Sequence, residues 1–200
     1  SSDVCSSDLV KSFGLGKFLD NDLPTGRRGN IPDTAYYDRF LGYKGWRGVT
    51  SVSNGIGQGE LVATPIQMAN MVAAIANRGY YCTPHIIKSI GDGTPIDSNY
   101  TVRRYTTVDS IHFPVVVDGM FEVFESGTAR GARIPHITQC GKTGTAQNPH
   151  GQDHSIFVSF APKDNPKIAL AVIIENGYWG SRWAAPIRSE EHTSELQSQF

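Results

Sequence analysis

The sequence predicts an α+β fold in which an antiparallel sheet is flanked by helices. Residues 64–78 and a segment beginning at Pro114 carry apolar residues at helical spacing. Three later segments, within 137–146, 155–160 and 168–174, are predicted strands. The last two are joined by a short connection containing Asp-Asn-Pro, which is typical of a hairpin. Consecutive strands joined in this way are expected to pair antiparallel.

Composition indicates a globular chain and excludes several classes of function. Of the 200 residues, 39% are hydrophobic and 18% charged, which suits one domain or most of a larger one. A net charge of −1 gives no reason to expect nucleic acid as a partner. The longest apolar run, 168–174, is far shorter than the roughly 20 residues that span a bilayer. The three cysteines show neither a disulfide framework nor zinc spacing, so the compartment of the protein cannot be inferred from them. No metal and no cofactor is expected.

The two ends of the chain differ from its middle. Residues 1–9 contain Ser-Ser-Asp twice with almost no apolar content, and residues 189–200 are a polar run rich in serine and glutamate. Both resemble translated sequencing-adapter sequence more than protein that evolved with the rest. We therefore expect a partial domain over residues 10–188, with non-native ends that pack poorly against it.

The first part of the domain is expected to be mostly irregular. Residues 11–30 are rich in glycine and asparagine and are predicted to be loop. Five aromatic residues follow and are expected to cover the core: Tyr36, Tyr37, Phe40, Tyr43 and Trp46. The run Gly55-Ile56-Gly57-Gln58-Gly59 is not a dinucleotide fingerprint, because its third glycine arrives one residue early. We expect these glycines to form a tight turn beside another backbone.

Residues 65–78 are predicted to form a helix. Thr64 suits the N-cap, Pro65 suits the first helical position and Gln67 completes a capping box. Gly79 provides the stop signal. One face of this helix is apolar and is expected to pack on the core.

The chain then continues with a strand predicted within 80–90 and a polar turn at 91–99. The second helix starts at Pro114 and ends before Gly127. Its apolar face carries Val117, Met120, Phe121 and Phe124. A third helix is predicted to begin near Trp179 and to pack on the sheet.

The stretch Gly141-Lys142-Thr143-Gly144-Thr145-Ala146 carries the clearest chemical signal. It is not a Walker A loop, because position 136 is histidine where that loop needs glycine, and no helix follows the lysine. Small residues at a strand edge leave backbone N–H groups open to an oxyanion or a carboxylate. The surviving interpretation is the Lys-Thr-Gly element of the serine penicillin-recognising enzymes.

The central part of the chain, about residues 10–187, resembles a known family. Four stretches carry the resemblance in order: Gly55 to Glu60, Ala63 to Met68, Gly141 to Ala146, and Phe160-Ala161-Pro162. Residues 20–29 are similar to a loop that follows the family's second motif. Together they resemble the C-terminal portion of the transpeptidase domain of penicillin-binding protein 2, the class B enzyme of bacterial cell elongation. The fold this implies is the penicillin-binding transpeptidase and serine β-lactamase-like fold, incomplete in this chain.

The resemblance implies acyl transfer between peptidoglycan stem peptides ending in D-Ala-D-Ala, and acylation by β-lactams. Lys142 would supply positive charge near the reacting hydroxyls, and the backbone N–H of Thr145 one donor of the oxyanion hole. Thr143 and Thr145 would bind the substrate carboxylate, with Gly144 keeping that face clear. It also implies a place on the periplasmic face of the bacterial inner membrane, an anchor upstream, and membrane proteins of cell elongation as partners.

One part of the family pattern is missing from the sequence. None of the seven lysines has serine three positions earlier, so the chain contains no Ser-x-x-Lys. The nucleophile is therefore expected upstream, and this chain alone is expected to be inactive. Two alternatives stay open: a serine β-lactamase or β-lactam sensor, and a non-catalytic interaction module of the cell-elongation machinery.

Overall fold

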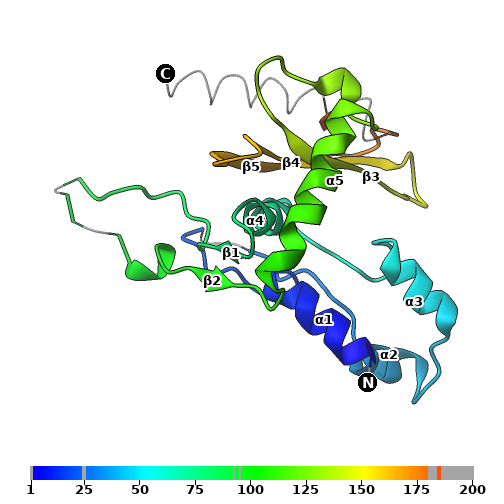
Figure 1. Ribbon diagram of the computed structural model, residues 1–200. Helices are drawn as coiled ribbons and strands as arrows, with labels where there is room; N and C mark the ends of the chain where they lie inside the picture. Colours follow the sequence, from blue (N-terminus) through cyan, green and yellow to red (C-terminus); the bar gives the residue numbers. More distant parts are fainter. Residues whose placement is uncertain (1, 24–25, 92, 95, 180–183, 186–200) are drawn as a thin grey trace.

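The computed structural model describes residues 2–23, 26–91, 93–94, 96–179 and 184–185. In Figure 1, helix α4 lies between a three-stranded sheet above it and the helices α1, α2 and α3 below it, while α5 crosses the sheet. The helices are α1 (Ser2–Ser12), α2 (Thr34–Leu41), α3 (Gly48–Gly55), α4 (Pro65–Ala76) and α5 (Phe113–Glu125). The strands are β1 (Tyr80–Tyr81), β2 (Arg104–Tyr105), β3 (Cys140–Ala146), β4 (His154–Ala161) and β5 (Ile168–Ile174).

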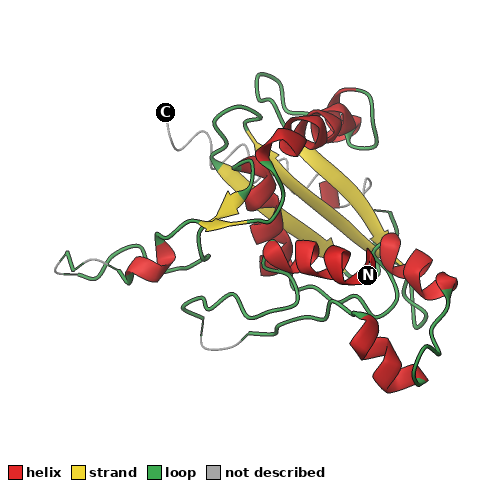
Figure 2. Cartoon of the chain, turned by 60° about the horizontal axis from the view of Figure 1, so that its bottom comes forward, coloured by secondary structure: helices red, strands yellow, loops and turns green. Residues whose placement is uncertain are grey.

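The main sheet has the order β3-β4-β5, and both pairings are antiparallel. Its register places Lys142 opposite Val158, and Val158 opposite Ala171. The three strands follow one another through short connections, as the hairpin signal predicted (Figure 2). The α+β fold with an antiparallel sheet and flanking helices is therefore confirmed.

The central strand β4 is buried on both faces by two apolar clusters. One cluster joins α4 and α5 to the sheet: Val72, Ala76, Val117, Met120, Cys140, Val158 and Phe160. The other lies on the opposite face: Phe124, Ala129, Ala132, Phe157, Ala184 and Ala185. Neighbouring side chains of a strand point to opposite faces, so Phe157 and Val158 enter different clusters. Two-sided burial explains why β4 is a nearly continuous run of apolar and small residues.

Helix α4 forms as its caps predicted. The Thr64 side chain accepts from the backbone N–H of Gln67, and the Gln67 side chain accepts from the backbone N–H of Thr64, so the capping box is complete. The helix ends at Ala76, two residues before the predicted end. Gly79 follows with φ +120°, a conformation that favours glycine. The stop signal therefore acts just beyond the helix.

Two buried amides of α4 also hold the preceding loop. Gln67 is 1% exposed, and its Nε2 donates to the carbonyl oxygens of Lys17 at 2.8 Å and Arg28 at 2.9 Å. Asn70, 4% exposed, donates to the carbonyl of Phe13 at 2.9 Å. Buried carbonyl groups need such partners, since leaving one unpaired costs about 1–3 kcal/mol. Helix α4 thus fixes the irregular segment that follows α1 within the predicted loop 11–30.

Several elements differ from the sequence predictions. Helix α1 covers residues 2–12, where the sequence analysis expected an end that packs poorly and, from residue 11, loop. Helices α2 and α3 were not predicted; Asp33 caps α2 by accepting from the backbone N–H of Tyr36 at 2.9 Å. The strand predicted within 80–90 is only β1, because Pro84 has no N–H for a ladder and the chain turns away. Of the aromatic residues expected to cover the core, Phe40 is 66% and Tyr43 80% exposed. That expectation was wrong for these two side chains.

The chain ends are only partly described. Residues 2–9 belong to helix α1, where Ser7 is buried and Leu9 is exposed. The third helix predicted near Trp179 lies mostly outside the described residues, although Ala184 and Ala185 are helical and fully buried. Residues 189–200 lie outside the described residues, so the domain limits of 10–188 stay a prediction. Among the described helices, none is long and apolar enough to cross a membrane.

Candidate active site

Strand β3 presents the lysine motif at the edge of the main sheet. It pairs with β4 on one side, and no other strand in the described part of the chain pairs with its outer edge. An edge strand offers main-chain N–H and C=O groups to an extended ligand. Lys142 and Thr145 are exposed, and Thr143 and Gly144 are half-buried. The predicted site residues are therefore accessible.

The two glycines of the motif have different surroundings. A Cβ atom on Gly141 would lie 2.7 Å from the carbonyl oxygen of Val158 and 2.8 Å from Cζ of Phe157, which is closer than real Cβ contacts. A Cβ atom on Gly144 would lie 3.5 Å from Cβ of Ile156, an ordinary van der Waals distance. Gly141 thus allows close packing of β3 on β4, whereas at Gly144 the fold itself does not require glycine.

Strand geometry sorts the motif side chains by face. Because side chains alternate along a strand, Thr143 and Thr145 share one face, and Lys142 and Gly144 the other. The two hydroxyls expected to bind a carboxylate are therefore brought to the same side. The Lys142 Nζ atom donates to the carbonyl oxygen of Thr143 at 2.7 Å, so the ammonium group stays beside the strand.

Thr128, which the sequence analysis did not single out, touches the motif. Its Oγ1 lies 2.7 Å from Oγ1 of Thr143, a normal length for a hydroxyl–hydroxyl hydrogen bond. Thr128 belongs to the turn that follows helix α5, and α5 packs against β3. In the sequence, a threonine directly after a helix-ending glycine gives little indication of a functional role. The contact between Thr128 and Thr143 becomes visible only once α5 is packed against β3.

The glycine-rich run lies next to the end of β3. A cavity of about 560 Å³ is lined by Gly57, Gln58, Gly59, Leu61, Ala146, Gln147, Asn148, Pro149 and Asp153. A Cβ atom on Gly57 would meet nothing within 4 Å, so the expectation of close packing beside another backbone was wrong there. Instead, Gly57 and Gly59 adopt positive φ angles in a turn that lines this cavity.

A buried tyrosine ties this glycine-rich turn to α2 and α3. The Tyr37 hydroxyl donates to Oε2 of Glu60 at 2.7 Å and accepts from Nδ2 of Asn54 at 2.8 Å. Burial, reinforced by the hydrogen bond to Glu60, raises the pKa of Tyr37 to about 12. The phenol therefore remains a hydrogen-bond donor at any physiological pH.

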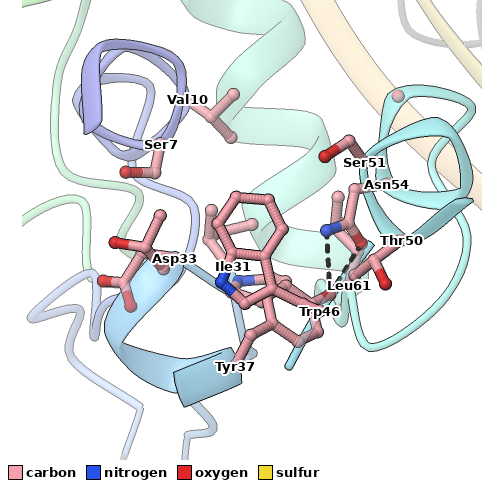
Figure 3. Close-up of a pocket in the computed structure, with 13 residues that line it drawn as sticks. Ser7, Val10, Ile31, Asp33, Tyr37, Trp46, Thr50, Ser51, Asn54 and Leu61 are labelled. Carbon is pink, nitrogen blue, oxygen red and sulfur yellow. Dashed lines mark hydrogen bonds between the residues drawn. The ribbon is translucent and has the colours of Figure 1, made fainter. Parts of the chain in front are cut away.

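Tyr37 and Asn54 also line a cavity of about 340 Å³ among α1, α2 and α3 (Figure 3). Figure 3 shows them joined by hydrogen bonds, with the Trp46 ring beside them. Ser7 lies in the wall of the same cavity, to which no residue of β3 contributes.

Comparison with protein families decides the membership of the chain. The model described as "Penicillin binding protein transpeptidase domain" matches residues 6–190. The chain belongs to the penicillin-binding protein transpeptidase family. This transpeptidase domain is 35% identical to the peptidoglycan D,D-transpeptidase MrdA of Acinetobacter baumannii over 86% of the chain. The chain spans 28% of that relative, and 30–32% of the MrdA proteins of Escherichia coli, Haemophilus influenzae and Salmonella typhimurium.

Solved structures agree with this assignment. Pseudomonas aeruginosa PBP2 in complex with WCK 5153 matches with a TM-score of 0.81 and 34% identity, over 94% of this chain and 41% of that one. Helicobacter pylori PBP2, solved in complex with MreC, matches with a TM-score of 0.75 and 28% identity, over 95% of this chain and 35% of that one. The chain is thus part of a transpeptidase domain of the PBP2/MrdA class, and the predicted fold family is confirmed.

Two facts bound the chemistry of this transpeptidase domain. Its sequence contains no Ser-x-x-Lys, as noted above. Across the described residues, no group of three or more histidine, cysteine, aspartate or glutamate side chains could hold a metal ion. The groups that strand β3 brings to the site are a lysine, hydroxyls and backbone amides.

Proposed function

We propose that this chain is the C-terminal part of the catalytic domain of a peptidoglycan D,D-transpeptidase. The observation that carries the proposal is the edge strand β3, which presents Lys142, Thr143, Gly144 and Thr145 in a chain of the transpeptidase family. An extended stem peptide would bind alongside this strand.

The proposed reaction is acyl transfer through a serine ester. The serine oxygen adds to the carbonyl carbon of the penultimate D-Ala, the peptide bond breaks, and the terminal D-Ala leaves with a proton on its nitrogen. An amine of a neighbouring stem peptide then attacks the ester, which gives a 4,3 cross-link and returns the serine. The serine and its partner lysine are proposed to come from sequence outside this chain, because Ser-x-x-Lys is absent from it.

The residues of β3 have distinct roles in this proposal. The Lys142 ammonium stabilises the alkoxide and aids proton transfer between the reacting groups. The backbone N–H of Thr145 is one donor to the developing oxyanion, and losing one such donor typically slows acyl transfer about 10²–10³-fold. The hydroxyls of Thr143 and Thr145 bind the terminal carboxylate from the face they share. Gly144 leaves room for the substrate backbone.

The proposed partners follow from the same chemistry. β-Lactams would acylate the missing serine as mimics of D-Ala-D-Ala, in keeping with the penicillin-binding family. The full-length protein is proposed to act at the periplasmic face of the inner membrane, held by an anchor outside this chain. Membrane proteins of cell elongation are proposed partners, since the H. pylori relative was solved with MreC.

Labelled penicillin added to the full-length parent protein tests the proposal. A stable acyl-enzyme is the expected result, detected as a mass shift of the intact protein. Rapid turnover of the adduct would instead indicate a β-lactamase, and no adduct would indicate an interaction module. The 200-residue chain alone is expected to form no adduct. A stoichiometric adduct on it would show that the nucleophile lies within these residues.

A further inference from the structure

We propose that Thr128 is a positioning residue for carboxylate recognition: its hydroxyl orients the hydroxyl of Thr143 toward the carboxylate of the substrate. This inference rests on the proposed function, because it concerns how β3 recognises the acyl donor. The observation behind it is the 2.7 Å contact between the two Oγ1 atoms.

The number of protons that the Thr128 and Thr143 hydroxyls can donate determines which of them is the donor to the other. A threonine hydroxyl donates one hydrogen bond and can accept two. A carboxylate only accepts, so Thr143 must direct its single proton at the carboxylate in order to bind it. Thr143 can do so and keep the contact to Thr128 only when Thr128 is the donor. The resulting chain runs from Thr128 to Thr143 to the carboxylate, and each hydrogen bond polarises the next.

The turn that carries Thr128 is held firmly on both sides. The N–H of Gly127 donates to the carbonyl of Glu122, and the N–H of Ala129 donates to the carbonyl of Val123, both at 2.9 Å. Ala129 is 2% exposed and packs in the apolar cluster with Phe157. The backbone of Thr128 is therefore fixed relative to the last turn of α5.

The close packing around Gly127 also shows that this turn is held against helix α5. A Cβ atom there would lie 2.8 Å from Cα of Val123 and 3.1 Å from its carbonyl oxygen, so the turn lies directly on the helix. A donor held next to Thr143 orients the Thr143 hydroxyl before a ligand binds. Binding therefore costs less rotational entropy at this hydroxyl. Thr128 itself is exposed and Thr143 half-buried, so the pair can be reached from solvent.

Acylation kinetics of the full-length parent protein test the role of Thr128. Thr128→Val removes the hydroxyl at nearly the same volume, and Thr128→Ser retains it. We expect Thr128→Val to lower the second-order rate constant for acylation by benzylpenicillin about 3- to 10-fold, the size of one net hydrogen bond. Thr128→Ser should restore it. Benzylpenicillin methyl ester, which has no carboxylate, should acylate the parent and the valine variant at equal rates.

A double-mutant cycle adds a second readout. Thr128→Val combined with Thr143→Val should be no slower than Thr143→Val alone, because the two hydroxyls act as one chain. The matched control is Thr101→Val, which removes an exposed threonine hydroxyl bonded to the carbonyl of Ser98 at 3.0 Å. This variant should acylate like the parent.

Several outcomes would overturn the inference. The first is that Thr128→Val slows acylation by benzylpenicillin and by its methyl ester equally. The second is that Thr128→Ser is acylated as slowly as Thr128→Val. The third is that the effects of Thr128→Val and Thr143→Val on the acylation rate are additive. Each would indicate general damage to β3 instead of carboxylate positioning. If the unchanged parent is not acylated by any penicillin, the proposed function itself fails and the inference falls with it.

Discussion

Gly141→Ala tests whether Gly141 is the glycine that the fold requires, in contrast to Gly144, for which a role in substrate binding is proposed. The new Cβ would lie 2.7 Å from the carbonyl oxygen of Val158, 2.8 Å from Cζ of Phe157 and 3.0 Å from Cβ of Ser159. None of the three can move freely. All belong to β4, which is hydrogen-bonded to a strand on each side, and Phe157 is fully buried against the Phe124 ring at 5.8 Å. The strands must therefore move apart.

The magnitude follows from the cost of overpacking. An extra methyl group in a packed interior costs about 1–3 kcal/mol, and a clash with the backbone of a central strand belongs at the upper end of that range. For a folded unit of 150–250 residues, the range that includes this chain, 1 kcal/mol changes Tm by about 2–4 °C. We expect Gly141→Ala to lower the Tm of the transpeptidase domain by about 5–10 °C.

Gly144→Ala is the matched control within the same strand. Its Cβ would make only ordinary contacts with Ile156, from 3.5 Å outward, so Tm should change by less than about 2 °C. Acylation by labelled penicillin should fall nonetheless, because the methyl group occupies space proposed for the substrate. Differential scanning calorimetry of the full-length parent and both variants measures the first effect, and labelling rates measure the second. Equal Tm values for the two variants would refute the packing argument.

Three further changes have definite expected outcomes. Gln67→Met removes the amide that donates to the carbonyls of Lys17 and Arg28, so the free energy of unfolding measured in urea should fall by about 2–4 kcal/mol. The cap variant Thr64→Ala should lower it by only about 1 kcal/mol. In the full-length protein Lys142→Ala should slow acylation strongly, whereas the exposed Lys167→Ala should match the parent; equal rates for both would remove Lys142 from the mechanism. Burial raises the pKa of the Cys140 thiol to about 12, so it stays protonated when folded and ionises from about pH 9 when unfolded. Stability from this group is therefore full below pH 9 and lost as the pH rises toward 12, and iodoacetamide at pH 8 should modify Cys140 only after unfolding. Because Cys82 is exposed, peptide mapping must locate the label, and rapid labelling of Cys140 itself in the native protein would contradict this burial.

Lys167 is a better control than the other lysine of the same hairpin. The Nζ atom of Lys163 lies 2.7 Å from Oδ1 of Asp118 and 4.6 Å from the centre of the Phe121 ring. The hydrogen bond to Asp118 raises the pKa of Lys163. Replacing Lys163 would therefore alter the contact between the hairpin and α5 as well as remove a charge, which would confuse the comparison with Lys142.

The sequence by itself determined the elements whose signals are local. Thr64, Pro65 and Gln67 lie within four consecutive positions, and the capping box they form depends on little outside them. The strands β4 and β5 are short apolar runs joined by a hairpin signal, so their pairing also follows from neighbouring residues. The lysine motif and the order of the family stretches were likewise sufficient to place the chain in its family.

Tertiary structure decided the contacts between distant segments. The pairing of Gln67 with carbonyls of the loop 13–28 spans up to 53 residues, and nothing local in the loop indicates it. Thr128 meets Thr143 because α5 packs against β3, and the glycine-rich turn meets the end of β3 from far along the chain. The short helices α2 and α3 were missed for a related reason: eight-residue helices are marginal alone and are stabilised by burial that the sequence pattern does not show. Local hydrogen bonds can be predicted from neighbouring residues, whereas contacts made by packing exist only once the whole domain has folded.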